Sequence, residues 1–292
     1  METCITTRAP AKINVTLEVI GKLSDDYHHI RSVLVKLHKL ADVIEIRIGA
    51  AVNGITISSD NGDLPLDEKN ICYRAARGYL RAAGETAGVH VHIRKKIPIA
   101  AGLGGGSSDA AAVLMALNNH FGKCIPAEVL QAMGSDLGKD VPFFLGKSKT
   151  GHVCEKGDRV KALPAFPRAD FLIVNPRILI STRDAYRSLA GHVWFMSDQA
   201  RVDRSRQMVK AIEAGDLTKV AVALYNDFEA LGERAHPVIK EIKQALIAFG
   251  ANGALMSGSG STVFGVFASR KALLRAEAAL RAHYPDFIIE VA

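Results

Sequence analysis

Hydrophobic and polar residues alternate in several short stretches of the chain, and this alternation predicts β-strands. In residues 13–19 every odd-numbered position is aliphatic and every even-numbered position is polar. Successive side chains of a strand point to opposite faces, so we expect a half-buried strand with Lys12 and Asn14 side by side on its polar face. The same alternation predicts strands over residues 43–48, 55–58 and 89–94.

Other segments have apolar residues at helical spacing. Residues 70–83 fit an amphipathic helix, residues 110–117 a buried alanine-rich helix, and residues 127–137 a helix ended by Gly138. In the second half of the chain the expected elements are, in order, strand 171–174, helices 181–189, 203–214, 216–231 and 237–249, strands 254–256 and 262–267, helix 269–284 and strand 287–291. With the middle helices set aside, this half has the order βαββαβ, which is typical of a ferredoxin-like two-layer sandwich.

A chain of 292 residues predicts one or two domains. Pro164 and Pro167 bracket a hinge, so we expect an N-terminal domain over residues 1–163 and a C-terminal domain over residues 164–292. The hydrophobic fraction of 48% and the charged fraction of 23% are ordinary for a soluble globular enzyme.

Charge and cysteine usage narrow the class of protein. No apolar run approaches the ~18 residues of a membrane span, and the first residues lack the layout of a signal peptide, so we expect a cytoplasmic protein. The four cysteines are scattered, which favours reduced thiols over metal ligands. The net charge of +7 suits anionic partners such as nucleotides, phosphates or RNA, and its dispersal along the chain favours small anions.

The stretch from Pro98 to Ala112 is the strongest candidate for a site. It contains four glycines followed by Ser107, Ser108 and Asp109, and then an apolar run. Glycines let the backbone approach a ligand closely, Ser108 or Asp109 is a good N-cap, and a helix N-terminus binds anions. We therefore predict a phosphate loop. Neither the Walker pattern nor the dinucleotide fingerprint fits, and a flexible loop before a core helix is the alternative.

Three weaker candidates lie elsewhere in the chain. Asp140, followed by Val-Pro-Phe-Phe, is either a carboxylate at the edge of an apolar site or a turn or capping residue. Residues 257–261 form a second glycine–serine run, either another part of a phosphate site or a plain hairpin turn. His90 and His92 share a strand face, where solvent-facing histidines are favoured over metal ligands because no third ligand lies nearby in the sequence.

Four stretches together resemble the GHMP kinases, the superfamily of galactokinase, homoserine kinase and mevalonate kinase. The glycine stretch resembles their phosphate loop, and residues 10–14, 138–144 and 256–264 agree with their other motifs in the same order. The spelling Gly-Leu-Gly-Gly-Gly-Ser-Ser-Asp-Ala-Ala resembles, more narrowly, the branch that acts in the non-mevalonate isoprenoid pathway.

The resemblance implies a fold and a reaction. The fold is α+β, with an N-terminal domain like domain 2 of ribosomal protein S5 and a ferredoxin-like C-terminal GHMP domain. The reaction moves the γ-phosphoryl of ATP, with Mg²⁺, to the 2-hydroxyl of 4-diphosphocytidyl-2-C-methyl-D-erythritol. The implied partner is thus a small cytidine diphosphate sugar alcohol, with neither nucleic acid nor membrane, and the implied assembly is a monomer or weak homodimer.

The resemblance also implies residue roles. Asp140 matches the catalytic aspartate, and Lys12 matches its partner. The positions that match residues holding the cytidine end, with Tyr186 as a second aromatic wall, are Asn14, Tyr27, His28 and Tyr186. The positions expected to bind ATP, the first two of them near the adenine and ribose, are Asn70, Lys95, Pro98, Ala101, Gly102, Leu103, Gly104, Gly105, Gly106, Ser107 and Ser108. The magnesium ligands stay open, with the hydroxyl of either Ser107 or Ser108 as a contact.

The sequence departs from the family pattern at Asp26, Lys139 and Lys156. These departures bear on fine substrate geometry. Two alternatives remain: a mevalonate-branch kinase with another acceptor, and an RNA-binding module. Tyr27 and His28 argue against the first, because an aromatic wall suits a nucleobase. An aromatic content of 6%, with no interleaving of aromatic and basic residues, argues against the second.

Overall fold

The computed structural model describes residues 2–23, 27–49, 52–190 and 203–292. The departure at Asp26 lies outside the described residues. The chain divides into two compact units, and two long strands, β1 (Thr3–Lys22) and β2 (His28–Gly49), run through both. The first unit consists of Met1–Ala11, Leu40–Ile97 and Gly104–Lys147, and the second of Lys12–Lys39, Pro98–Leu103 and Ser148–Ala292. The predicted domain division at residues 163 and 164 stays a prediction.

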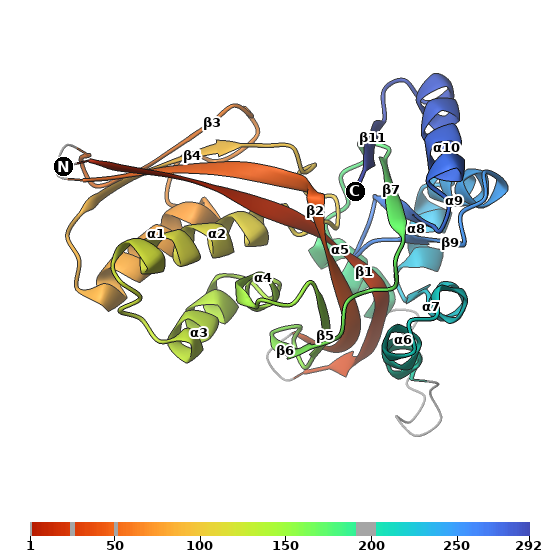
Figure 1. The fold of residues 1–292 in the computed structure, drawn as a ribbon, viewed down its shortest axis with the longest axis horizontal. Helices are drawn as coiled ribbons and strands as arrows, with labels where there is room; N and C mark the ends of the chain where they lie inside the picture. Colours follow the sequence, from red (N-terminus) through yellow and green to blue (C-terminus); the bar gives the residue numbers. More distant parts are fainter. Residues whose placement is uncertain (1, 24–26, 50–51, 191–202) are drawn as a thin grey trace. The chain divides into compact units, whose positions relative to one another are not determined.

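The first unit packs helices against a sheet. The end of β2 pairs antiparallel with β4 (Gly88–Arg94), which pairs in parallel with β3 (Ile55–Ser59). Figure 1 shows the helices of this unit together on one side of these strands. They are α1 (Ile71–Ala83), α2 (Gly105–His120), α3 (Ala127–Leu137) and α4 (Val141–Leu145).

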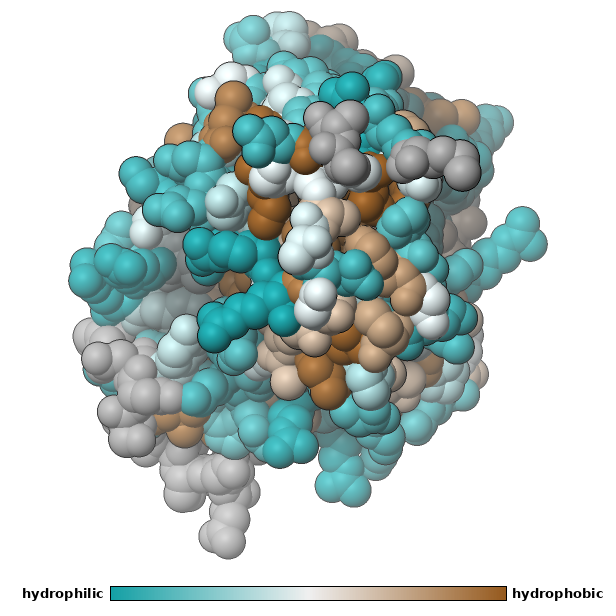
Figure 2. Space-filling view, turned by 90° about the vertical axis from the view of Figure 1, so that its left-hand side faces the viewer, coloured by the Kyte–Doolittle hydropathy of each residue, from teal (hydrophilic) through white to brown (hydrophobic). Residues whose placement is uncertain are grey.

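The core of the first unit lies between that sheet and α2. The alternating residues of β2 and β4 bury Ile44, Ile46 and Ile93, and α2 buries its apolar run almost completely. Burial on all sides explains why α2 reads as uniformly apolar. Figure 2 looks onto the end of this unit and shows hydrophilic residues over much of its surface, with hydrophobic residues gathered between them.

The second unit contains an antiparallel sheet in which β11 (Ile288–Val291), β7 (Asp170–Asn175), β10 (Val263–Phe267) and β9 (Gly253–Met256) pair in that order. This is the ferredoxin-like order that the sequence predicts. The helices α9 (Val238–Ala248) and α10 (Arg270–His283) share one apolar core with the sheet, which includes Leu246, Phe267 and Leu273.

The remaining strands of the second unit extend the sheet of β1 and β2. The start of β2 pairs with β5 (Thr150–Cys154), which pairs with β6 (Arg159–Ala162), and β1 pairs in parallel with β8 (Tyr225–Asn226). The helices are α5 (Thr182–Ala190), α6 (Arg204–Glu213), α7 (Leu217–Ala223) and α8 (Glu229–Ala235).

Two predictions of local structure are wrong. The helix expected over residues 216–231 is interrupted: α7 ends at Ala223, and Tyr225 and Asn226 pair with Thr16 and Leu17 of β1. In addition, α2 begins at Gly105 after Gly104 as N-cap, so Ser108 and Asp109 lie inside the helix and do not cap it. The glycine N-cap has φ +69°, a conformation that glycine adopts without steric cost.

The first strand was predicted to be half-buried, and this is also wrong because its polar face is buried too; Lys12 and Asn14 do lie side by side on that face. The exposed fraction is 4% for Lys12, 5% for Asn14 and 0% for both Thr16 and Glu18. Buried polar groups need partners, and here each finds them in neighbouring segments. Burial of this face brings the chemistry of β1 into the interior of the second unit.

Candidate active site

Lys12 and Asn14 lie in the second unit, where Lys12 contacts the first part of the glycine stretch, Pro98–Leu103, which we call the first glycine loop. The Lys12 Nζ donates to the Asn14 Oδ1 at 2.6 Å and to the Gly102 carbonyl at 2.9 Å, and the Lys12 N–H donates to the Leu103 carbonyl at 2.9 Å. An ammonium that is buried needs such acceptors, because leaving water costs a charge far more than it costs a neutral group. These contacts fix the glycine loop to β1.

The second glycine–serine run packs on the first. The Ser257 Oγ donates to the Gly102 carbonyl at 3.0 Å and accepts from the Asn14 N–H at 3.3 Å. Gly102 has φ +75°, and a Cβ placed on it would stand 2.1 Å from the Ser257 carbonyl oxygen. A Cβ on Gly258 would stand 3.1 Å from the Gly102 Cα. The run is therefore more than a hairpin turn, since two glycines let two backbones touch.

Sequence reasoning missed the residue that anchors the second run. The Asn226 Nδ2 donates to the carbonyls of Met256 at 2.7 Å and Gly258 at 2.8 Å, and its Oδ1 accepts from the Phe228 N–H at 2.9 Å. These bonds explain why the helix is interrupted here. The only local signal was the pair Asn226-Asp227 inside an otherwise helical pattern, since both residue types compete with helical hydrogen bonding.

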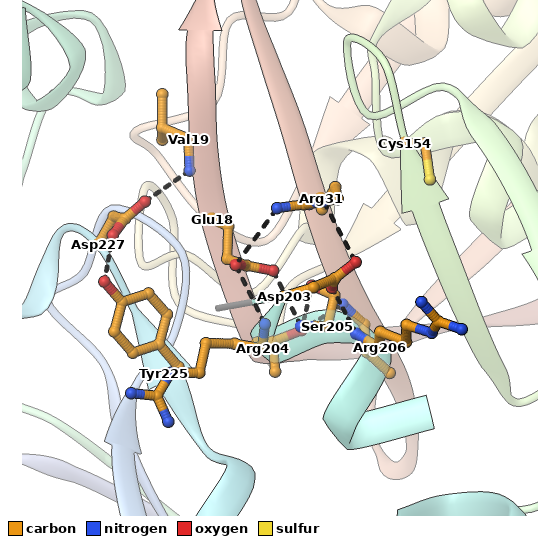
Figure 3. Close-up of polar contacts among 12 residues, drawn as sticks. Glu18, Val19, Arg31, Cys154, Asp203, Arg204, Ser205, Arg206, Tyr225 and Asp227 are labelled. Carbon is orange, nitrogen blue, oxygen red and sulfur yellow. Dashed lines mark hydrogen bonds and ion pairs between the residues drawn. The ribbon is translucent and has the colours of Figure 1, made fainter. Parts of the chain in front are cut away.

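Glu18, another even-numbered residue of β1, also lies on the polar face and is buried. Its carboxylate accepts from the N–H groups of Arg204 at 3.2 Å and Ser205 at 2.9 Å at the start of α6, and lies 3.8 Å from the Arg31 guanidinium. Figure 3 shows these contacts, with Asp203 bound to Arg31 on the other side. A carboxylate at a helix N-terminus is stabilised by the N–H groups and the dipole there. This network ties α6 to β1 and β2.

The N-terminal end of α2, in the first unit, is open. The first N–H groups of an α-helix have no acceptor within the helix, and the N-cap Gly104 has no side chain to supply one. Among the described residues the Ser108 Oγ and the Asp109 Oδ1 are buried without a hydrogen-bond partner. An uncapped helix end that follows a glycine loop is the arrangement that binds phosphate.

Lys95 is buried between two carboxylates in the first unit. Its Nζ donates to Asp42 and, at 2.9 Å, to Asp109, and 4% of its side chain is exposed. Burial by itself would lower the pKa of Lys95, but the two carboxylates outweigh it and the pKa is raised. Burial raises the pKa of Asp109 to about 7 against the opposing effect of Lys95. Asp42, which no motif pointed to, completes this group.

Asp140 directly precedes α4. Its backbone is helical, with φ −84°, and its side chain makes no capping hydrogen bond. Pro142 and two phenylalanines behind it are buried, which agrees with a carboxylate at the edge of an apolar region. The neighbouring Lys139 Nζ donates to the Ser135 carbonyl at 3.1 Å and to its hydroxyl at 3.2 Å.

Aromatic residues gather near the start of β2 in the second unit. The His28 ring stacks on Tyr186 with centroids 4.6 Å apart, and Tyr186 contacts Phe228 edge-on at 4.8 Å. Tyr27 is 50% exposed, and the Lys156 Nζ lies 5.2 Å from its ring centroid. The structure therefore joins His28 to Tyr186, and gives Lys156, a departure from the family pattern, a cation–π contact.

Asn70 is the N-cap of α1. Its Oδ1 accepts from the Cys72 N–H at 2.8 Å, and its Nδ2 donates to the Pro65 carbonyl at 2.7 Å. The expected histidine face also has local partners: the ring nitrogens of His90 bind Thr56 at 2.8 Å and Ser58 at 3.0 Å. His92 binds Ser58 at 2.8 Å.

Neither a ready-made metal cage nor a membrane helix is found in the part of the chain that the structure describes. No group of three or more His, Cys, Asp or Glu side chains is placed to hold a metal ion, and no described helix is long and apolar enough to cross a membrane. Mg²⁺ in kinases keeps several waters and binds through few protein oxygens plus the substrate phosphates. The unpartnered Ser108 hydroxyl is an oxygen donor that fits such a site.

Comparison with known families supports a kinase. Residues 70–147 match the model of the GHMP kinases N-terminal domain, and residues 208–286 match that of the GHMP kinases C-terminal domain. These matches cover more than half of the chain and include the whole glycine stretch and Asp140.

Individual relatives agree. The chain is 41% identical to 4-diphosphocytidyl-2-C-methyl-D-erythritol kinase of Syntrophotalea carbinolica, over 89% of this chain and 88% of the relative. It is 40% identical to the kinase of the same name from a Geobacter strain, over 92% of each chain. A solved 4-(cytidine 5'-diphospho)-2C-methyl-D-erythritol kinase superposes with a TM-score of 0.77 at 31% identity over 98% of both chains. A homoserine kinase from Cytophaga hutchinsonii, at 20% identity over 99% of this chain and 93% of its own, shares the fold with a TM-score of 0.79. The chain therefore belongs to the 4-diphosphocytidyl-2-C-methyl-D-erythritol kinase family of GHMP kinases.

Proposed function

We propose that this protein transfers the γ-phosphoryl group of ATP to the 2-hydroxyl of 4-diphosphocytidyl-2-C-methyl-D-erythritol. The observation that carries the proposal is the packing of Lys12 and Ser257 on the Gly102 carbonyl, because it joins three of the four family motifs in one hydrogen-bonded group. Phosphoryl transfer needs mainly positioning and charge neutralisation, and this group supplies a lysine at the edge of a glycine loop.

Within this proposal Asp140 accepts the proton of the attacking hydroxyl, and Lys12 stabilises the charge that develops on the transferring phosphoryl group. Support for Asp140 is its position directly before α4, where the buried Pro142, Phe143 and Phe144 place its carboxylate at the edge of an apolar region. Support for Lys12 is its burial. Its exposed fraction is only 4%, and burial of a charged ammonium costs free energy, so a functional role would explain why a lysine stands there.

The nucleotide sites follow from the same logic. The glycine stretch and the open end of α2 bind the ATP phosphates, with Mg²⁺ neutralising charge and Ser107 or Ser108 contributing a hydroxyl. The cytidine end lies against Tyr27, His28 and Tyr186, with Asn14 nearby; the stacking of His28 on Tyr186 supports an aromatic base site. We further propose that the enzyme is cytoplasmic, a monomer or weak homodimer, and binds no nucleic acid.

A parallel assay tests the substrate. ATP consumption is measured with diphosphocytidyl-methylerythritol, mevalonate, homoserine and galactose, and we expect turnover with the first alone. Turnover of mevalonate instead would show that the protein is a mevalonate-branch kinase. Binding to RNA that collapses steeply with added salt would favour the binding-module hypothesis.

Asp140→Asn tests the chemistry. The asparagine keeps the shape and loses the proton acceptor, so kcat is expected to fall by about 10²–10⁴ while both Michaelis constants change little. Lys12→Ala is expected to lower kcat similarly, and the two losses will not add if the residues act as one unit. An Asp140→Asn enzyme with near-normal kcat would make Asp140 a turn residue.

A further inference from the structure

Three charged side chains, Asp42, Lys95 and Asp109, are buried together in the first unit and form what we call the brace. Lys95 donates to both carboxylates, and the second Asp42 oxygen accepts from the N–H groups of Lys96 at 2.6 Å and Ile97 at 2.8 Å. The exposed fractions of the brace side chains are 0% for Asp42, 4% for Lys95 and 3% for Asp109. A buried charge group with so many partners is a rigid part of the structure.

The brace contacts the chain on both sides of residues 98–103, the first part of the glycine stretch. The chain leaves the first unit after Ile97 and re-enters it at Gly104. Asp42 holds the departing segment through its two backbone N–H bonds, and the ion pair of Lys95 with Asp109 links that segment to α2, with which the chain re-enters. A Cβ placed on Gly105 would stand 3.1 Å from the Lys95 Nζ, so the ammonium lies directly against the first residue of α2.

We propose that Asp42 and Lys95 are positioning residues for ATP: they hold the two ends of the phosphate loop, and Lys95 acts on the nucleotide through the loop without touching it. This inference rests on the proposed function. Its basis is that Lys95 lies between two carboxylates with almost no surface left for a ligand. Holding a loop in its binding conformation raises affinity, because a ligand then pays less to order it.

The alternative is the role that the family resemblance implies, a direct contact of Lys95 with the adenine or ribose. The two roles differ in which part of ATP they serve. A residue that positions the loop affects binding of the triphosphate, whereas a residue that touches the nucleoside affects adenosine equally. Inorganic tripolyphosphate and adenosine are therefore the two probes that separate them.

The test measures the affinities of ATP, tripolyphosphate and adenosine by calorimetry for the wild type, Lys95→Met, Asp42→Asn and the control Lys96→Met. Lys96 is the adjacent lysine and is exposed, and methionine keeps the backbone N–H that Lys96 donates to Asp42, so this variant removes the same charge and retains that hydrogen bond. If the brace variants populate the binding conformation of the loop about a tenth as often, the Kd of ATP and of tripolyphosphate rises about tenfold. Adenosine affinity is expected to stay within twofold, and kcat at saturating ATP to change less than KM.

The double variant Lys95→Met/Asp109→Asn covers the case in which Lys95→Met does not fold, because it removes a charge of each sign and leaves Asp42 with its two N–H donors. It is expected to lose tripolyphosphate affinity in the same way. Equal losses of adenosine and ATP affinity in the folded variants, or unchanged ATP affinity, would overturn the inference. If the wild type binds ATP and phosphorylates its acceptor and the variants do the same, the positioning role is wrong and the proposed function stands. If the wild type binds neither ATP nor tripolyphosphate, both the positioning role and the proposed function are wrong.

Discussion

Replacement of Gly102 by alanine tests the contact between the two glycine loops most directly. Gly102 has φ +75°, and a Cβ would come within 2.1 Å of the Ser257 carbonyl oxygen, a backbone atom that has no side-chain freedom to move away. The loops would have to separate. The Gly102 carbonyl would then lose its bonds from Lys12, at 2.9 Å, and from Ser257, at 3.0 Å.

The magnitude follows from these contacts. Placing a non-glycine residue at a left-handed φ costs roughly 1–2 kcal/mol. The bond from the charged Lys12 is worth about 1.5–3 kcal/mol and the bond from Ser257 about 0.5–1.5 kcal/mol. We therefore expect Gly102→Ala to lower the free energy of unfolding by about 3–6.5 kcal/mol, with a loss of ATP affinity where the variant stays folded.

Gly215→Ala is the matched control. Gly215 lies in the same unit with φ +65°, and a Cβ on it would meet no atom within 4 Å. Alanine there incurs the conformational cost alone, about 1–2 kcal/mol. Urea unfolding followed by circular dichroism gives both values, and calorimetry gives ATP affinity. If Gly102→Ala is no less stable than Gly215→Ala and binds ATP normally, the loops do not depend on this contact and our interpretation of the site is wrong.

Three further predictions concern the base site, the glycine N-cap and the half-buried Lys36. Tyr27→Ala and Tyr186→Ala should each weaken binding of the cytidine substrate by about 1–3 kcal/mol, the usual worth of stacking on a base, while titration with ATP shows little change. Gly104→Val should abolish ATP binding in calorimetry without unfolding the protein, because a branched residue is strongly disfavoured at its φ of +69°. Burial lowers the pKa of Lys36 from 10.5 to about 8, so the folded state binds its proton less tightly than the unfolded state does. Stability should therefore rise between about pH 8 and 10.5, and denaturation midpoints of Lys36→Met should lose that rise.

Elements with a complete local signal were predicted well. The helix over residues 70–83 has its N-cap at Asn70, an apolar face and Gly84 at its end, and the structure contains α1 at Ile71–Ala83. The ferredoxin-like sheet followed from the order of elements in the second half of the chain, βαββαβ once the middle helices are set aside, which is typical of that fold.

Elements that depend on distant residues were not predictable. Residues 216–231 have helical spacing throughout, yet Asn226 binds carbonyls some thirty residues away and pulls its segment into a short strand beside β1. For β1 the strand was predicted correctly, but the exposure of one of its faces was not. Its alternation is real, but its polar side is buried because Thr16 and Glu18 find partners on β2 and α6, segments that a local pattern does not see. Propensity is a weak prior where such tertiary partners exist.

The glycine stretch shows why a motif identified a site without revealing how the site is built. The interpretation of the stretch as a phosphate loop assigns one role to all four glycines, which is to let a ligand approach the backbone closely. The structure separates three causes: Gly102 admits a second backbone, Gly104 takes the positive φ of the helix N-cap, and Gly105 makes room for the ammonium of Lys95. The first and third are contacts within the protein, so alanine at either position would damage the loop before any ligand arrived. Loss of ATP binding in a glycine variant therefore does not by itself show that a glycine touches phosphate, and the comparison of tripolyphosphate with adenosine is needed to tell a broken loop from a lost contact.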